Sequence, residues 1–256
     1  MAKVNVYKTI ELLNQTLAED ILSLCQACIE NHGTFHIALA GGGTPKKLYQ
    51  LISSDTFREK YPWENIHVYF GDERCVPADH EDSNYRMANE ALLTKVPVPV
   101  ENIHPIHIDV DNVAASADRY NDELITCLPN DQGTPKFDLI LLGIGDDGHT
   151  ASLFPGTPIL QQMKKYVDAV YVEKFNSWRI SITYPLINAA ANIYLLATGD
   201  GKARIVKSVM FDEPPVEPYP IQRIQAQGNL YWYLDNTAAA QAAEVVLNQA
   251  NADKST

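Results

Sequence analysis

Three short apolar runs in this chain each end in a glycine-bearing turn, and this recurrence constrains the fold more than any other feature. The runs FHIALA, HVYF and FDLILL are followed by GGGTP, GDER and GIGDDGH. A continuous apolar run such as FDLILL is typical of a strand buried on both faces. Because helical patterns separate such runs, the sequence predicts a mostly parallel sheet covered by helices on both faces.

The remaining elements fit the same α/β pattern. Apolar spacing predicts a helix over residues 10–31, and Ser83 is the expected N-cap of a later one. Further strands are expected at VDAVYV, WRISIT, NIYLLAT and NLYWYLD, with helices at 199–210 and 237–250. No linker or repeat divides the chain, so we expect one Rossmann-like three-layer domain over residues 1–256, with a frayed tail at 250–256.

Net charge and cysteine content limit which partners and which cellular compartment are expected. The net charge of −12 argues against nucleic acid and anionic membrane surfaces as partners, although a few local cations still suffice for a small anionic ligand. Cys25 and Cys28 form a C-x-x-C inside an amphipathic helical pattern without a second pair, which does not support a zinc ribbon. Free thiols, and the lack of a signal-peptide-like start or a membrane-spanning run, predict a cytoplasmic protein.

The glycine loop is the first candidate binding element. Its residues Gly41, Gly42, Gly43 and Thr44 follow a strand and precede a helix. Backbone N–H groups approach an oxyanion closely in such a loop, and the helix dipole favours negative charge, so the loop suits a phosphate group. A flexible turn between a strand and a helix is the simpler interpretation.

Charged side chains at the ends of other strands are further candidates. Asp72, Glu73 and Arg74 form either a surface ion pair or a site in which Arg74 clamps an oxyanion. Arg179 opens a strand, and Lys202 lies at a turn between a strand and a helix. Lys202 is either a solvated lysine or a phosphate anchor, because ligands of parallel sheets bind beyond the carboxyl ends of strands.

The segment GIGDDGHTASLFP has the glycine spacing of a dinucleotide-binding turn. That interpretation requires a helix to open at the third glycine and an acidic residue to follow the next strand, about 20 positions on. Pro155, Gly156 and Pro158 leave no room for this helix, and Asp168 precedes the apolar run that it should follow. Nucleotide binding is therefore disfavoured.

A second interpretation of the segment is acid–base chemistry. Asp147 and His149 lie on a glycine-flanked loop after a buried strand, where the carboxylate can orient the imidazole and stabilise its protonated form. A lone histidine is more often structural, and the other six histidines are interpreted as structural or surface residues.

Taken in order, these segments resemble a known family. AGGGTPKKLY, VYFGDERCVPADHEDSNYRMANEALL, FDLILLGIGDDGHTASLFPG, WRISITYPLINAA and TGDGKARIV are similar to the 6-phosphogluconolactonases. The related glucosamine-6-phosphate deaminases typically have DEY in place of residues 72–74 and GHIAFNEPG in place of GHTASLFPG. The distinguishing positions favour the lactonase.

The resemblance implies a deaminase/isomerase-like fold and hydrolysis of 6-phosphoglucono-1,5-lactone. It implies that His149 activates water and Asp147 orients it, while Arg179, Lys202 and the loop from Gly41 to Thr44 hold the phosphate. Asp72 is carried over as a substrate-binding residue, and Arg74 as one that contacts either the phosphate or the developing oxyanion. No metal and no organic cofactor is implied, because a δ-lactone is already activated toward water.

The chain departs from the family pattern at a few positions, and alternatives remain. Ala40 and Gly43 replace the two usual serines of the glycine loop, which makes its backbone amides and Thr44 more important. Asp146 adds negative charge beside Asp147 and is expected to raise the pKa of either His149 or one of the carboxylates. A sugar-phosphate deaminase or isomerase, and a non-catalytic sugar-phosphate-binding module, are the competing interpretations. The sequence leaves open whether the protein is a monomer or a small homo-oligomer.

Overall fold

The computed structural model describes residues 2–131, 133–213 and 215–242. Its centre is a six-stranded sheet in the order β1-β11-β10-β7-β2-β3, in which every neighbouring pair is parallel. The strands are β1 (Lys3–Tyr7), β2 (Phe35–Leu39), β3 (Ile66–Phe70), β7 (Leu139–Gly143), β10 (Asn192–Ala197) and β11 (Asn229–Asp235). The predicted parallel sheet is confirmed, and β1 is an edge strand that the sequence interpretation missed.

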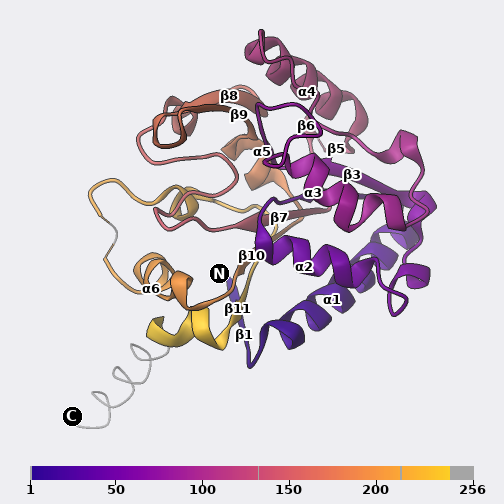
Figure 1. Cartoon of the computed structure of the whole chain (residues 1–256), viewed down its shortest axis with the longest axis horizontal. Coiled ribbons are helices and arrows are strands. Elements are labelled where there is room, and N and C mark those ends of the chain that lie inside the picture. The colour runs from indigo at the N-terminus through magenta and orange to yellow at the C-terminus, as the bar shows by residue number, and fades with distance from the viewer. Residues whose placement is uncertain (1, 132, 214, 243–256) are drawn as a thin grey trace.

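Helices surround this sheet (Figure 1). The α-helices are α1 (Ile10–His32), α2 (Gly43–Ile52), α3 (Asn84–Ala91), α4 (Val113–Cys127), α5 (Tyr184–Ala189) and α6 (Ala203–Met210). Short 3-10 helices are η1 (Arg58–Lys60), η2 (Trp63–Asn65), η3 (Leu93–Lys95), η4 (Val100–Asn102), η5 (Pro158–Gln161), η6 (Glu173–Phe175), η7 (Asp200–Lys202) and η8 (Pro220–Arg223). The predicted closing helix is present over residues 236–242. The rest of it, and the expected tail, lie outside the described residues.

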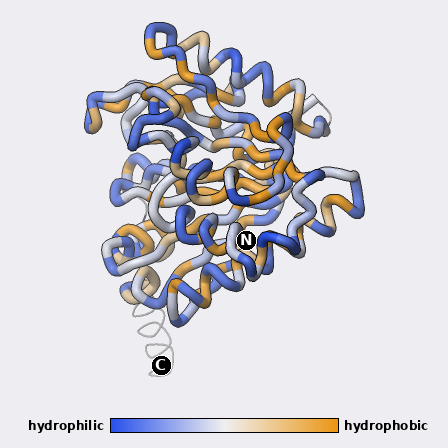
Figure 2. The backbone as a smooth tube through the Cα atoms, turned by 45° about the vertical axis from the view of Figure 1, so that its right-hand side comes forward, coloured by the Kyte–Doolittle hydropathy of each residue, from blue (hydrophilic) through white to orange (hydrophobic). Residues whose placement is uncertain are grey.

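Local sequence explains where these elements begin and end. The Thr9 side chain caps α1 by accepting a hydrogen bond from the Leu12 N–H at 3.2 Å, and α1 stops at Gly33, whose φ of 91° is left-handed. Ser83 caps α3 as predicted. Every residue of β2 and β10 is buried, so the centre of the sheet is covered on both faces. Figure 2 shows the hydrophobic segments gathered in the middle of the molecule.

A second, smaller sheet is antiparallel, which differs from the parallel pairing expected for its strands. Strands β8 (Val167–Val172) and β9 (Ser177–Ile182) occur as predicted, but they pair antiparallel with each other, and β9 pairs antiparallel with β4 (Asp72–Arg74). The physical reason is the short connection between β8 and β9, because parallel strands need a crossover of a dozen residues or more. The GDER segment is thus a strand itself. A two-stranded hairpin, β5 (Asn130–Asp131) and β6 (Thr134–Pro135), completes the described strands.

The helices pack in neighbouring groups. α2 packs beside α1 and α3, and α4 packs on β8 and β9. Within the described part of the chain, no helix combines the length and apolar character that a membrane span requires.

Candidate active site

The three glycine-bearing turns meet at the carboxyl edge of the parallel sheet, as predicted. There they line a pocket of about 240 Å³. The predicted site residues in its wall are Gly41, Gly42, Asp72, Arg74, His149 and Lys202. Segments distant in the sequence therefore contribute one imidazole, two cations and a glycine loop to a single pocket.

His149 and Asp147 form a close pair. The His149 Nδ1 atom lies 2.5 Å from Asp147 Oδ1, and the Asp147 carboxylate also accepts a hydrogen bond from the His149 N–H at 3.2 Å. Lys174 donates to the other carboxylate oxygen at 3.1 Å. Because Nδ1 faces the carboxylate, the Nε2 atom of the neutral ring is the one left to accept a proton. The arrangement suits a general base.

Close packing fixes the position of the imidazole. The ring stacks on Phe154 with 4.0 Å between centroids. On another side, the backbone of Gly145 is so close that an added Cβ would lie 1.9 Å from His149 Cε1. Glycine is thus required at 145 by the imidazole itself. No helix opens at Gly148; the turn ends in a loop that leads to η5, in agreement with the disfavoured dinucleotide interpretation.

The two neighbouring carboxylates behave differently from the expectation. Burial opposes ionisation of Asp147, but hydrogen bonds from His149 and Lys174 outweigh this effect and lower the pKa of its carboxyl to about 2. The hydrogen bond from Lys202, at 2.5 Å, lowers the pKa of Asp146 as well. The expectation that one of these carboxylates has a raised pKa is therefore wrong, because each has its own cationic partner. The alternative expectation, which concerns His149, stays a prediction.

The glycine loop delivers backbone donors to the pocket. Gly42 is the N-cap of α2 with a φ of 101°, a conformation that favours glycine, and Gly43 begins the helix. The N–H groups of this first turn have no partner within the helix and are available to an anion. Thr44 is engaged elsewhere, with its hydroxyl 2.7 Å from that of Thr198, and neither Gly43 nor Thr44 lines the pocket.

Arg179 lies in an adjoining pocket of about 380 Å³. Asp72, Arg74, His149 and Ala151 line both pockets, so the two spaces meet along these side chains. Arg74 and Arg179 face each other across β4 and β9. Burial, and then the charge of Arg74, lower the pKa of Arg179, and its buried Nε has no hydrogen-bond partner in the described structure. Two neighbouring arginines of this kind favour a bound anion.

Asp72 joins two of the motifs instead of forming an ion pair with Arg74. Its carboxylate accepts hydrogen bonds from Ser152 at 2.6 Å and from the Asn84 side chain at 3.2 Å. Glu73 is buried and accepts from the N–H groups of Asn84 and Tyr85, both at 2.8 Å, at the start of α3. The surface ion-pair interpretation of GDER is therefore wrong, because these carboxylates organise neighbouring segments.

Several residues of the site escaped the sequence interpretation. Asn84 and Thr150 line the first pocket, Phe154 supports the imidazole, and Lys174 and Ser152 bond to site carboxylates. Thr150, Ser152 and Phe154 lie in HTASLFP, and Asn84 lies in SNYR, both of which the family resemblance includes. Lys174 belongs to no quoted motif and had no signal.

The fold and the pocket define the class: a Rossmann-like α/β protein with a His–Asp pair and cationic side chains at the carboxyl edge of its parallel sheet. The family described as "Glucosamine-6-phosphate isomerases/6-phosphogluconolactonase" matches residues 8–232. The chain belongs to this family.

Named relatives agree with this assignment. The chain is 41% identical over 241 residues to a 6-phosphogluconolactonase of Nostoc sp., which covers 91% of this chain and 98% of the relative. It is 43% identical over 211 residues to a 6-phosphogluconolactonase of Synechocystis sp., with 82% and 85% covered. The solved 6-phosphogluconolactonase of Trypanosoma brucei superimposes with a TM-score of 0.81 at 31% identity, over 94% of this chain and 98% of that one.

Proposed function

We propose that the protein hydrolyses 6-phospho-D-glucono-1,5-lactone to 6-phospho-D-gluconate in the oxidative pentose phosphate pathway. The observation that carries the proposal is the His149–Asp147 pair at 2.5 Å in the wall of a pocket that also holds Lys202 and the glycine loop. The relatives that match most of the chain bear the name of this activity.

His149 acts as the general base. Its Nε2 takes a proton from a water molecule while the oxygen of that water attacks the C1 carbonyl of the lactone, and a tetrahedral oxyanion forms. The ring C1–O5 bond then breaks, and the proton on the imidazole passes to the leaving oxygen. Asp147 holds the ring in the required tautomer and stabilises its cationic form, as Lys174 in turn supports the carboxylate.

The phosphate group binds at the glycine loop. The N–H groups of Gly41 and Gly42, which line the pocket just before α2, supply backbone donors, and Lys202 supplies positive charge on the same pocket wall. The N–H of Gly43, the first residue of α2, is the next donor along the chain, although Gly43 itself does not line the pocket. Arg179 adds positive charge from the adjoining pocket. Thr44, through its hydrogen bond to Thr198, holds the loop in place.

Arg74 is assigned to the developing oxyanion. It is the cation that lies with His149 in the walls of both pockets, whereas Lys202 and Arg179 each line one. A guanidinium beside the reacting carbonyl stabilises charge that appears only in the transition state. Asp72 positions this region through Ser152 and Asn84.

The protein is proposed to work in the cytoplasm, and its free cysteines fit a reducing compartment. These are Cys25, Cys28, Cys75 and Cys127.

The proposal is tested by the rate at which freshly prepared lactone disappears, followed by NMR at mildly acidic pH. The rate of spontaneous hydrolysis is subtracted. A rate that rises in proportion to protein concentration supports it. Ammonia release from glucosamine 6-phosphate without lactone turnover would instead establish a deaminase. Tight calorimetric binding of 6-phosphogluconate without turnover of either compound would establish a non-catalytic binding module, and both of these results reject the proposal.

A further inference from the structure

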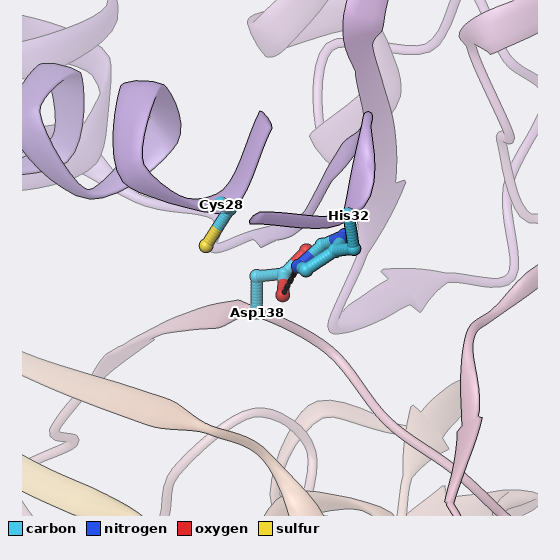
Figure 3. Close-up of side chains that lie close together, drawn as sticks. All are labelled: Cys28, His32 and Asp138. Atoms are coloured by element: carbon cyan, nitrogen blue, oxygen red, sulfur yellow. Dashed lines mark hydrogen bonds and ion pairs between the residues drawn. The ribbon is translucent and has the colours of Figure 1, made fainter. Parts of the chain in front are cut away.

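We propose that Cys28, His32 and Asp138 form a zinc site at the edge of the sheet opposite the active site. Figure 3 shows the three side chains close together, with the His32 ring against the Asp138 carboxylate and Cys28 beside them. One ligand atom from each, a sulfur, an imidazole nitrogen and a carboxylate oxygen, lies within 4.8 Å of the other two. The site is independent of the proposed lactonase activity.

Helical geometry and sheet topology create this cluster. Cys28 and His32 are four residues apart in the last turns of α1, so their side chains share one face of the helix. Asp138 directly precedes β7 and reaches the same point, with its Oδ1 atom 3.1 Å from His32 Nε2. The cluster thus joins the end of a helix to the start of a central strand.

The donor set selects the kind of metal. Thiolate, imidazole and carboxylate together are the ligands of Zn²⁺, whereas Mg²⁺ and Ca²⁺ prefer oxygen ligands alone. Zinc–ligand bonds of about 2.0–2.3 Å place neighbouring ligand atoms roughly 3–4 Å apart in a tetrahedron. The three side chains therefore need only small movements to bind one ion, and water supplies the fourth ligand.

Surrounding hydrogen bonds orient the Asp138 carboxylate for metal binding. The second oxygen of Asp138 accepts a hydrogen bond from the His36 N–H at 2.8 Å, and its carbonyl accepts from the Asn192 side chain at 3.0 Å. The carboxylate is thereby fixed with its other oxygen toward His32, which is how outer hydrogen bonds orient metal ligands. The His32 side chain is 35% exposed, which gives an ion a path from solvent.

The position of the site separates it from catalysis. Asp138 lies before β7, and the loop with His149 follows its end at Gly143. Five residues of extended chain, at about 3.3 Å each, set the two regions roughly 16 Å apart. A bound ion would tie α1 to β7 and stabilise the fold without touching the substrate.

Cobalt(II) tests the proposal, because it replaces zinc and its bond to a thiolate gives a charge-transfer absorption band. Chelator-treated protein titrated with Co²⁺ should bind one ion per chain and show this band, and Zn²⁺ should displace it. Cys28→Ser should abolish the band and weaken binding at least about 100-fold. Cys127→Ser, which removes an exposed cysteine on α4, is the matched control and should leave both unchanged.

A second variant keeps the test decisive if Cys28→Ser disturbs folding. His32→Ala changes a partly exposed side chain at the helix end and should also lose tight binding, while circular dichroism verifies that it is folded. Lactone hydrolysis by the metal-free protein should be unchanged in both variants. Absence of stoichiometric binding, binding without a thiolate band, or a band that survives Cys28→Ser would each overturn the proposal.

Discussion

The two ends of strand β7 differ in how well their polar groups are satisfied. At the start, both oxygens of the Asp138 carboxylate have partners, and its carbonyl accepts from Asn192. Beyond the other end, Thr150 Oγ1 and Arg179 Nε are buried without partners; they are two of three such side-chain atoms in the described residues. Arg74 and Arg179 also pair across β4 and β9 there, and the charge of Arg74 contributes to the lowered pKa of Arg179.

The difference indicates that the region beyond the carboxyl end of β7 is less stable than it could be, because its polar groups are arranged for a ligand. Buried polar atoms without a partner in the protein and neighbouring cations cost free energy, and binding of an anion offsets that cost. A substitution beyond the carboxyl end of β7 should therefore change activity more than stability. A substitution at the amino end should do the reverse.

The largest expected effect is that of His149→Ala. Loss of the general base should lower kcat about 10²- to 10⁴-fold, while circular dichroism shows a folded protein. His107→Ala removes an exposed histidine and serves as the control. Near-normal rates in His149→Ala, after subtraction of spontaneous hydrolysis, would remove this residue from the mechanism.

Gly145→Ala should have the next largest effect on kcat. The new Cβ would lie 1.9 Å from His149 Cε1, so the imidazole must move, and a misplacement of about 1 Å costs on the order of 10²-fold in kcat. Gly201→Ala, whose Cβ meets no atom within 4 Å, is the control. Equal kcat values for the two variants would show that packing by Gly145 does not position the ring.

Lys202→Ala should raise KM by about 10- to 100-fold and change kcat less, because a charge-assisted bond to phosphate contributes roughly 1.5–3 kcal/mol. Asp146→Asn should do the opposite and lower KM up to about fivefold, since it releases Lys202 from its exposed carboxylate partner. Steady-state kinetics measure both. An unchanged KM for Lys202→Ala would place the phosphate elsewhere.

At the amino end, Asp138→Ala should lower the free energy of unfolding by about 1–3 kcal/mol, because the N–H of His36 loses its acceptor. Metal-free protein is used, and kcat should stay unchanged. Asp55→Ala, which removes a carboxylate that is 97% exposed, should cost less than about 1 kcal/mol. Urea unfolding measures the free energy of unfolding of both variants. Equal values would contradict the proposed difference between the two ends of β7.

The smallest effect concerns pH. The pKa of Asp147 is lowered to about 2 from 3.8, so its ionised form stabilises the folded state. This contribution, at most about 2 kcal/mol, is fully present above pH 3.8 and is lost as the pH falls through about 2. Asp147→Asn should remove that part of the acid sensitivity. Identical pH dependence of unfolding in both proteins would contradict the lowered pKa.

Local sequence predicted the features that depend on local physics. Continuous apolar runs predicted the central strands, and Ser83 predicted the start of a helix. The close spacing of Asp147 and His149 predicted that their side chains pair. Pairings between distant segments were not predictable. His32 and Asp138 are 106 residues apart, and Lys202 and Asp146 are 56 apart, so only the folded chain brings them together. The antiparallel pairing of β8 with β9 was missed although their short connection predicts it, whereas the pairing of β9 with β4 joins segments far apart in the sequence.

The roles of His149 and the glycine loop are tested by a crystal structure with bound 6-phosphogluconate. We expect the product carboxylate within hydrogen-bond distance of His149 Nε2, and the phosphate in contact with Lys202 and the N–H groups that precede α2. A phosphate beside His149, or a carboxylate that lies away from the imidazole, would contradict it.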